Sequence, residues 1–517
     1  MTRITCYDGV NCIGGNKILL EDGDKKLFFD FGKNFGAEGE FYEEFIQPKN
    51  LAGLYEPVQM GFLPPFRDLY RDDMVSELCD PWLDIDAREI GEVGGEVGGV
   101  LVSHAHVDHI GSLHYLRTDI PIYCSPMTAA ISRALQDTGT SPSAAEYCYY
   151  VCRTEKEGEG LSSPHWKTHP YAGRKYHLTD GSGSAEFCRF WQSTPDSREL
   201  EALVCEPART CAGLNIRSFP VDHSVYGATA WAVETEAGWV VYSGDVRLHG
   251  AYGDYTRRFA EEAAKLNPIA LIIEGTRIES ESGNTEASVK DACLDVVKDC
   301  RGLVIADFGP RNVERLISFL EIARETGREL AILPKDAYLL DAMRNAGGSQ
   351  TVPPVDSQGI RIYREYSGSA KKWKARMLET YAHLCVTPEQ LSANQDRFIC
   401  CLSFWDVNEL PYIRPVPGSI WLSSNCEAFN EEMQIDERRL RNWLDRFGLE
   451  FVGGDTGHNS PFHVSGHASG SDLMEIVRTI RPKMLIPVHT EHPEIYAEKV
   501  GGICDVRLPE KGVGVEI

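Results

Sequence analysis

The sequence predicts an α/β protein with more than one domain. At 517 residues the chain is too long for one compact core. Several apolar runs typical of strands end in a histidine or an aspartate, and from about residue 280 such runs alternate with segments of helical periodicity. This alternation is typical of a parallel sheet. The expected strands of this part are 303–308, 330–333, 398–402 and 419–422, and the expected helices are 289–300, 313–326 and 435–447. The first segment, up to about residue 119, is expected to be rich in strands. A hydrophobic content of 42% suffices for ordinary globular cores.

The strongest motif places three histidines and one aspartate within six positions, directly after the apolar run 99–102. Side chains alternate along a strand, so His104 and His106 point the same way if the strand continues through them. Asp108 and His109 follow where the chain turns and can face a second point. Such nitrogen and oxygen ligands suit zinc, with manganese or iron as alternatives. The motif predicts two metal ions, and the competing interpretation is a histidine-rich surface loop.

Four other strand ends offer the remaining ligands. Asp30, His223, Asp245 and His489 each follow a short apolar run. Taken singly, a histidine or aspartate in this position is more often a turn former or a satisfied polar group. Together with the first motif they predict one metal centre at one edge of a sheet.

Two further motifs narrow the prediction. An apolar strand at 271–273 closes on Glu274, and the run Ser-Gly-His-Ala-Ser at 465–469 sets His467 in a turn of small residues before an amphipathic segment. With these motifs the chain resembles the metallo-β-lactamase superfamily and, within it, the β-CASP nucleases such as ribonuclease J. The stretch 465–490 matches that family almost continuously.

The resemblance implies a role for each of these residues. One metal would be held by His104, His106 and His223, the second by Asp108, His109 and His489, and Asp245 would bridge both. Asp30 would orient ligands from behind through hydrogen bonds. His467 would contact the scissile phosphate and be held by Glu274. A histidine at position 489 is associated in the family with RNA cleavage, whereas DNA-directed relatives often carry valine.

The resemblance also implies the architecture. We expect an αββα sandwich with an inserted α/β domain, the β-CASP domain. The metallo-β-lactamase domain would occupy 1–279 and be completed by 456–517, with the β-CASP domain at 280–455. His109 and His223 are 114 residues apart in the sequence, so we expect a lineage-specific insertion at about 128–210. The C-terminal dimerisation domain typical of ribonuclease J is expected to be missing, which leaves a homo-oligomer open.

The expected activity is hydrolysis of RNA phosphodiester bonds by two metals, most simply zinc, with manganese as the alternative. The cleavage would be 5′-exonucleolytic, endonucleolytic or both, in RNA processing or decay. Asp108 and Asp245 would orient the attacking oxygen, His467 would donate a proton to the leaving oxygen, and Ser469 would donate to a phosphate oxygen. The alternatives are a β-CASP DNA nuclease, a small-molecule metallo-hydrolase, and a metal-free binding subunit of an RNA-processing complex.

The formal net charge of −25 argues against a broad nucleic-acid platform, since phosphate contacts demand a basic face. A narrow groove for single-stranded RNA is compatible with it. Candidate phosphate contacts are Arg311 and Arg315, together with a basic group at Lys371, Lys372, Lys374 and Arg376. A solvated helix face is the competing interpretation of that basic group.

The sixteen cysteines include no Cys-x-x-Cys pair, which argues against a disulfide framework or a zinc ribbon. We expect them to be small buried side chains in a reducing compartment, with a structural metal at Cys148, Cys152, Cys205 and Cys211 as the alternative. The sequence contains no apolar run near the ~18 residues that a membrane span needs and begins without a signal-peptide pattern. These features predict a cytoplasmic protein with no membrane contact.

Overall fold

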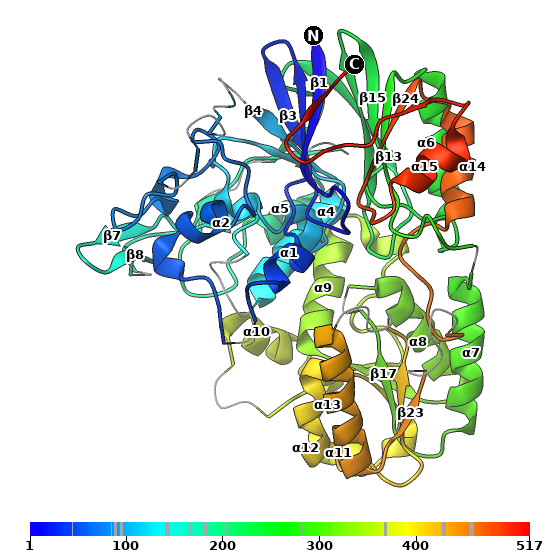
Figure 1. The fold of residues 1–517 in the computed structure, drawn as a ribbon. Helices are drawn as coiled ribbons and strands as arrows, with labels where there is room; N and C mark the ends of the chain where they lie inside the picture. Colours follow the sequence, from blue (N-terminus) through cyan, green and yellow to red (C-terminus); the bar gives the residue numbers. More distant parts are fainter. Residues whose placement is uncertain are drawn as a thin grey trace.

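Two mixed β-sheets pack face to face, with helices on their outer sides (Figure 1). The computed structural model describes residues 1–43, 45–83, 85–86, 90–91, 93, 97–139, 145–165, 167–179, 181, 183–201, 205–281, 283–309, 311–366, 370–425, 431–453 and 460–517. The predicted αββα sandwich is confirmed.

The first sheet has, among the described residues, the strand order β11-β10-β5-β4-β3-β2-β1-β26. Its strands are β1 (Thr2–Asp8), β2 (Lys17–Asp22), β3 (Lys25–Phe29), β4 (Val97–Leu101), β5 (Ile122–Cys124), β10 (Tyr176–Leu178), β11 (Cys205–Pro207) and β26 (Gly514–Glu516). The pairs β26-β1, β1-β2 and β2-β3 are antiparallel, and the pairs from β3 to β11 are parallel. The two ends of the chain therefore lie side by side (Figure 1).

The second sheet has the order β12-β13-β14-β15-β16-β24-β25 in the part of the chain described. Its strands are β12 (Thr210–Cys211), β13 (Leu214–Pro220), β14 (Thr229–Thr235), β15 (Gly238–Tyr242), β16 (Ala270–Glu274), β24 (Met484–Val488) and β25 (Asp505–Val506). The first four are antiparallel to their neighbours, and β15, β16, β24 and β25 run parallel. Parallel strands place their carboxyl ends at one edge, which is where the metal-ligand motifs occur.

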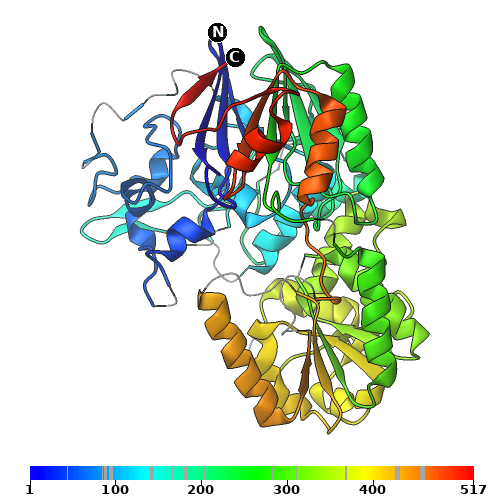
Figure 2. The same cartoon turned by 45° about the vertical axis from the view of Figure 1, so that its right-hand side comes forward.

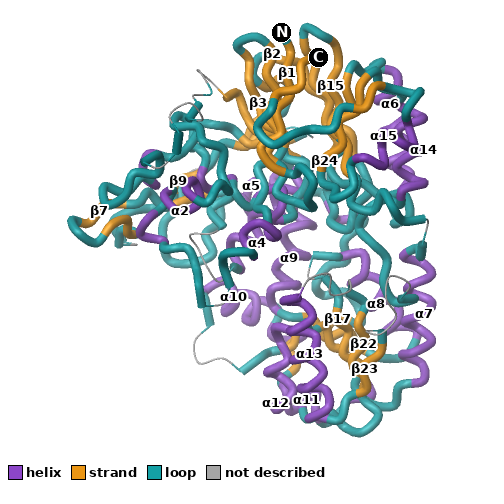
Figure 3. The backbone as a smooth tube through the Cα atoms, in the orientation of Figure 1, coloured by secondary structure: helices purple, strands orange, loops and turns teal. Residues whose placement is uncertain are grey.

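Alternation along β14 shows how the sandwich is held together. Trp231 and Val233 pack into the core between the sheets, while Ala230 and Ala232 face the outer helices. The outer helices on this side are α6 (Gly253–Lys265), α14 (Gly470–Ile480) and α15 (Glu494–Val500). Figure 3 shows them flanking the second sheet. Small alanines let these helices approach the sheet closely.

A third sheet, entirely parallel, is built from the middle of the chain (Figure 2). Its described strands, in the order β20-β19-β18-β21-β17-β22-β23, are β17 (Val304–Asp307), β18 (Glu329–Ile332), β19 (Ile360–Tyr363), β20 (Cys385–Val386), β21 (Phe398–Cys401), β22 (Ile420–Ser423) and β23 (Glu450–Val452). The helices of this part are α7 (Glu286–Asp299), α8 (Val313–Glu325), α9 (Pro334–Asn345), α10 (Lys372–Thr380), α11 (Pro388–Ser392), α12 (Leu410–Ile413) and α13 (Glu431–Phe447). The predicted strand–helix alternation is confirmed.

Two stretches differ from the expectations. We expected strands up to about residue 119, but the described part of residues 35–83 contains only the short helices α1 (Phe35–Gly39) and α2 (Tyr55–Gln59) and single turns of 3₁₀ helix. The segment expected as an insertion, 128–210, includes strands β10 and β11 and thereby widens the first sheet. Its other described elements include the end of α4 (Pro126–Thr138), α5 (Ala185–Trp191) and two small antiparallel strand pairs. The strand β6 (Tyr149–Tyr150) pairs with β9 (Ala172–Gly173), and between them in the sequence β7 (Thr154–Lys156) pairs with β8 (Gly160–Ser162).

A buried ion cluster joins the sandwich to the third sheet's helices. The Arg247 guanidinium is fully buried and pairs with Asp222 of the sandwich and with Glu286 and Glu314 of α7 and α8. Arg315 pairs with the other oxygen of Glu286 at 2.9 Å. One cation thus ties three carboxylates from two parts of the fold into a single network.

Candidate metal centre

Strand ends bring the predicted ligands to one edge of the sandwich. His104, Asp245 and His489 follow β4, β15 and β24, and Glu274 is the last residue of β16. The pairing of β16 with β24 aligns Glu274 with Val488, the residue before His489. Residues far apart in the sequence therefore converge because parallel strands end together.

A short helix, α3 (Val107–Ile110), divides the histidine-rich motif at 104–109 into two halves. His106 is the residue before the helix and has extended backbone angles, whereas Asp108 and His109 lie in its single turn. His104 and His106 consequently face one point and Asp108 and His109 another. The predicted division into two ligand pairs is present in the geometry.

The first ligand group consists of His104, His106, His223 and Asp245, whose ligand atoms all lie within 4.8 Å of one another. His106 Nδ1 is 3.0 Å from His104 Nε2 and 3.1 Å from His223 Nε2. Ligands at 2.0–2.1 Å in a tetrahedron around zinc are about 3.3 Å apart. The three imidazoles therefore match one zinc-sized ion.

The second ligand group consists of Asp108, His109, His489 and the same Asp245. His489 Nε2 lies 3.2 Å from Asp108 Oδ2, and His109 Nε2 lies 3.1 Å from Asp245 Oδ2. A third group joins Asp245 and His489 with Glu274 and His467. Asp245 belongs to all three groups, which is the position that a bridging carboxylate requires.

Unsatisfied polar atoms show that these groups fit metal ions. Both carboxylate oxygens of Asp245 and the Nε2 atom of His109 are buried; although His109 Nε2 lies 3.1 Å from Asp245 Oδ2, none of these atoms has a hydrogen bond of good geometry among the described residues. Burying such atoms unpaired is costly, and a divalent cation would satisfy all of them. Residues of the right chemistry and spacing for divalent metals are thus present.

In His109, His223 and His489 the ring nitrogen that points away from the ligand group has a partner of its own. The carboxylate of Asp30 accepts hydrogen bonds at 2.7 Å from His109 Nδ1, from the Ser103 hydroxyl and from the Tyr242 hydroxyl. His223 Nδ1 donates to the Gly466 carbonyl at 2.6 Å, and His489 Nδ1 lies 2.8 Å from Thr276 Oγ1. These bonds hold the tautomer that leaves Nε2 free for a metal.

Burial and neighbouring charge give the histidines different protonation states. Burial lowers the pKa of His106 to about 3 and lowers the pKa of His104 and His223 well below the ordinary value. Burial would also lower the pKa of His109, but the carboxylates of Asp245, Asp108 and Asp30 outweigh it and raise that pKa. The first ligand group therefore presents three neutral imidazoles, the form that binds metal.

His467 is the second cationic histidine of the site. Its Nδ1 lies 3.0 Å from Glu274 Oε2 and 3.8 Å from Asp245 Oδ2. Burial lowers the pKa of His467, yet Glu274 and Asp245 raise it to about 9. Glu274 is itself held by the Val246 backbone N–H at 2.8 Å. A protonated imidazole thus lies beside the shared carboxylate.

Ser469 caps α14 in the structure. Its hydroxyl accepts the Asp472 backbone N–H at 3.2 Å and lies 2.8 Å from the Ser471 hydroxyl. This is the ordinary role of a serine at a helix N-terminus. The contact of Ser469 with a phosphate oxygen stays a prediction.

The candidate phosphate contacts separate into two kinds. Arg311 lies near the metal-ligand groups, with its guanidinium close enough to Asp108 and His106 to influence the pKa of His106. Arg315 was wrongly expected to contact phosphate, because it is buried and pairs with Glu286. Within the basic group at 371–376, the described side chains of Lys371, Lys374 and Arg376 bond to Gly139, Glu365 and Thr194.

Several residues of the site carry no signal in the sequence. Ser103, Tyr242, Thr276 and Gly466 each hold a ligand or its partner, but they are common residue types whose role depends on distant segments. A Cβ on Gly466 would lie 3.1 Å from His223 Cε1, so the close approach of this loop to His223 favours glycine.

The comparisons with known proteins agree with this site. Residues 459–500, which include His467 and His489, match the family model of the Zn-dependent metallo-hydrolase RNA specificity domain. Fold and site are similar to those of one class of protein, the metallo-β-lactamase proteins with a β-CASP domain.

Within this class the chain is ribonuclease J-like. It is 20% identical over 521 residues to ribonuclease J of Helicobacter pylori, a match covering 99% of this chain and 59% of that protein. It is 24% identical to ribonuclease J of Mycolicibacterium smegmatis, covering 100% of this chain and 74% of the relative. The chain thus spans about three fifths of the length of the Helicobacter relative.

A solved structure shares the fold. The crystal structure of a protein of unknown function from Enterococcus faecalis V583 superposes with a TM-score of 0.63 at 21% identity, covering 99% of each chain. In the described residues, no helix is long and apolar enough to cross a membrane. Among the described residues no cysteine forms a disulfide. The expectation of buried cysteines holds only in part, because Cys152 and Cys188 are exposed.

Proposed function

We propose that the chain is a two-metal-dependent ribonuclease that hydrolyses RNA phosphodiester bonds, as a 5′-exonuclease, an endonuclease or both. The observation that carries the proposal is His467, which lies in the segment matched to the RNA specificity domain. Its ring is paired with Glu274 and lies beside Asp245, the carboxylate shared by both ligand groups. This combination provides a proton donor next to the place where a phosphodiester would meet the metals.

Two divalent ions, most simply zinc, would make a nucleophile available near neutral pH and offset charge on the phosphoryl oxygens. His104, His106 and His223 would hold one ion, Asp108, His109 and His489 the other, and Asp245 both. The carboxylates of Asp108 and Asp245 orient the attacking oxygen for in-line displacement. Asp30 keeps the His109 ring in place through the bond to Nδ1.

His467 transfers the proton that the departing oxygen requires. With its pKa raised by Glu274 and Asp245, the ring is protonated at neutral pH. Protonation of the leaving oxygen converts a poor leaving group into a neutral hydroxyl. Arg311, near Asp108, adds positive charge at the same side of the site.

The finer expectations are part of the proposal. The net charge of −25 disfavours a broad duplex platform, and a narrow groove for single-stranded RNA is compatible with it. We further propose a metallo-β-lactamase domain at 1–279 and 456–517, a β-CASP domain at 280–455, and a cytoplasmic location.

The test combines metal analysis with cleavage. The wild type should contain about two metal ions per chain and release mononucleotides or fragments from 5′-monophosphorylated single-stranded RNA. The variant Asp108→Ala/His109→Ala should lose metal and cleavage together. The variant Asp396→Ala/His383→Ala removes the same residue types at exposed positions and is the matched control.

The outcomes separate the alternatives. Preferential cleavage of matched single-stranded DNA would replace the proposal by a β-CASP DNA nuclease. Two metals without cleavage of either polymer would favour a small-molecule hydrolase. Absence of metal from the wild type would leave the binding-subunit interpretation.

A further inference from the structure

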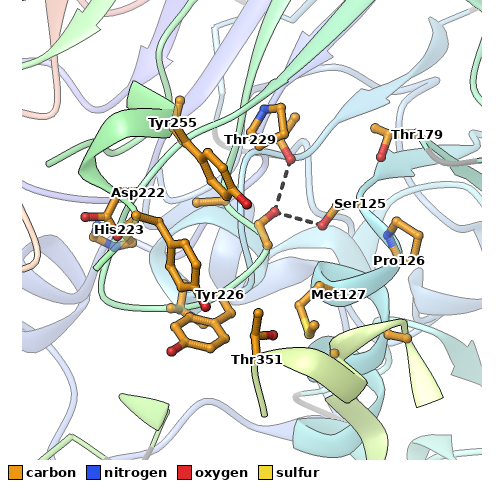
Figure 4. Close-up of a pocket in the computed structure, with 18 of the residues that line it drawn as sticks. Ser125, Pro126, Met127, Thr179, Asp222, His223, Tyr226, Thr229, Tyr255 and Thr351 are labelled. Atoms are coloured by element: carbon orange, nitrogen blue, oxygen red, sulfur yellow. Dashed lines mark hydrogen bonds between the residues drawn. The ribbon is translucent and has the colours of Figure 1, made fainter. Parts of the chain in front are cut away.

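A cavity of about 400 Å³ opens beside the metal-ligand groups, at the junction of the sandwich and the third sheet's helices (Figure 4). His223, one of the predicted metal ligands, forms part of its wall. The start of α4, the loop 225–229 and the start of α6 contribute from the sandwich, and the turn after α9 contributes Gly347 and Thr351. The cavity falls within the size range of small-ligand sites.

Three tyrosines line one side of the cavity. The rings of Tyr226 and Tyr252 meet edge to face at 5.4 Å, and those of Tyr252 and Tyr255 stack at 5.4 Å with 18° between their planes. Tyr226 is buried, whereas Tyr255 is 47% exposed. The row of tyrosine rings therefore ends at Tyr255, whose partly exposed ring is available for stacking with a planar ligand.

The cavity wall is nearly without charge. Among the described residues that line it there is no lysine, arginine or glutamate, and its one aspartate, Asp222, is paired with Arg247. Burial raises the pKa of Tyr226 and of Tyr252, so both phenols stay neutral. Such a wall is suited to an uncharged ring and not to a phosphate.

Hydroxyl groups fix the floor of the cavity. Ser125 donates to the Gly227 carbonyl at 2.8 Å, and Thr128 and Thr229 donate to the same oxygen at 3.0 Å. Gly227 has φ +86°, and a Cβ there would come within 2.6 Å of Met127 Cβ. The loop is therefore held in one conformation, and the cavity exists before any ligand arrives.

We propose that this cavity holds a nucleobase of the polynucleotide whose phosphodiester lies at the metal-ligand groups, stacked on Tyr255. The inference rests on the proposed function. A nucleobase is planar, uncharged and polarisable, and single-stranded nucleic acids are commonly bound by stacking bases on aromatic rings. Because His223 belongs both to the cavity wall and to a ligand group, the base belongs to a nucleotide close to the scissile bond.

Replacement of Tyr255 tests the stacking. Base–aromatic stacking of about 1–3 kcal/mol corresponds to about 5- to 150-fold in affinity. Tyr255→Ala should raise KM for single-stranded RNA by at least about 5-fold with little change in kcat, and Tyr255→Phe should restore the wild-type KM. Tyr412→Ala, at an exposed tyrosine that also contacts another tyrosine ring, is the matched control. An unchanged KM in Tyr255→Ala would overturn the proposal.

Abasic substrates identify the stacked nucleotide. Removing the base at one position near the scissile bond should weaken wild-type binding by the same factor as Tyr255→Ala. An abasic substrate combined with Tyr255→Ala should lose no more binding affinity than either change loses alone. If the losses instead multiply at every position, Tyr255 does not contact a base and the proposal fails.

Binding measurements separate this proposal from the proposed function. Fluorescence anisotropy of labelled RNA with Asp108→Ala/His109→Ala, with and without Tyr255→Ala, reports on the cavity without cleavage. If the wild type cleaves no RNA but Tyr255→Ala still weakens base-dependent binding, the activity is refuted and the cavity assignment stands. If RNA is cleaved, and is bound equally with and without Tyr255, the activity stands and the cavity assignment is refuted.

Discussion

The histidines around Asp245 form two electrostatic kinds. Burial keeps the imidazoles of His104, His106 and His223 neutral, which frees their lone pairs for a metal. Glu274 and Asp245 keep His467 cationic, which makes it a good proton donor. Burial and nearby carboxylates thus give one residue type different protonation states.

Replacing His467 separates proton donation from metal binding. His467→Ala should retain the metal content of the wild type, because His467 belongs to neither of the two main ligand groups. Turnover should fall by about 100-fold or more, the usual contribution of a general acid. Elemental analysis and single-turnover cleavage check both parts. Full turnover at full metal occupancy would remove His467 from the mechanism.

At the level of elements, the third sheet carries an ionisable group that is costly to bury. Asp307, the last residue of β17, accepts a hydrogen bond from Trp421 Nε1 at 3.2 Å. Burial raises the pKa of Asp307 to about 7. The unfolded chain releases this proton near pH 4, whereas the folded protein keeps it until about pH 7. The contribution to stability is therefore full below pH 4 and declines as the pH rises to 7.

Asp307→Asn removes the ionisation and keeps an oxygen for Trp421. We expect the free energy of unfolding to rise by up to about 4 kcal/mol at pH 8 and to change little at pH 4. Urea titrations at the two pH values measure the difference. Asp356→Asn, at an exposed aspartate, should have no such pH-dependent effect. Equal effects of Asp307→Asn at both pH values would show that folding does not raise the pKa of Asp307.

The elements were predictable where hydrophobic periodicity was strong. Strands β17, β18, β21 and β22 and helices α7, α8 and α13 lie within about four residues of their expected positions. The short edge strands β20 and β23 were missed because two or three residues are too few to show an alternation of apolar and polar side chains. The loop-rich stretch 35–83 was also missed, since its apolar residues resemble strand residues although some, such as Phe45, are exposed.

The candidate site was predictable because its ligands lie at the ends of strands, and the same position brings them together in the fold. Strand-end histidines and aspartates are visible in sequence, and parallel strands deliver them to one edge. Thr276 and Gly466 were not predictable, because each acts on a histidine more than 200 residues away. Arg315 was misassigned because its partner Glu286 lies on another helix. The positive charge of Arg315 is visible in the sequence, but the ion pair that neutralises it is not.

At the level of the whole molecule, Arg247 links the sandwich to the third sheet's helices. Without Arg247, Asp222 and Glu314 would be left buried without a counter-charge, while Glu286 would keep its pair with Arg315. Arg247→Gln should therefore lower the free energy of unfolding by about 3–5 kcal/mol.

The matched control for Arg247→Gln is Arg257→Gln, which breaks an exposed pair with Asp254 and should cost less than about 1 kcal/mol. Chemical denaturation of both variants provides the comparison. Losses of equal size would show that the buried network contributes no more than a surface ion pair.

The contact between Asp108 and His489 joins residues that are 381 positions apart. At about 5–20 residues per second, a ribosome needs about 20–80 s to add the second after the first. During that interval the nascent chain carries the first histidine cluster without the partner that completes it. The second ligand group therefore stays incomplete until β24 has been synthesised, whereas the first ligand group is complete once Asp245 has been added.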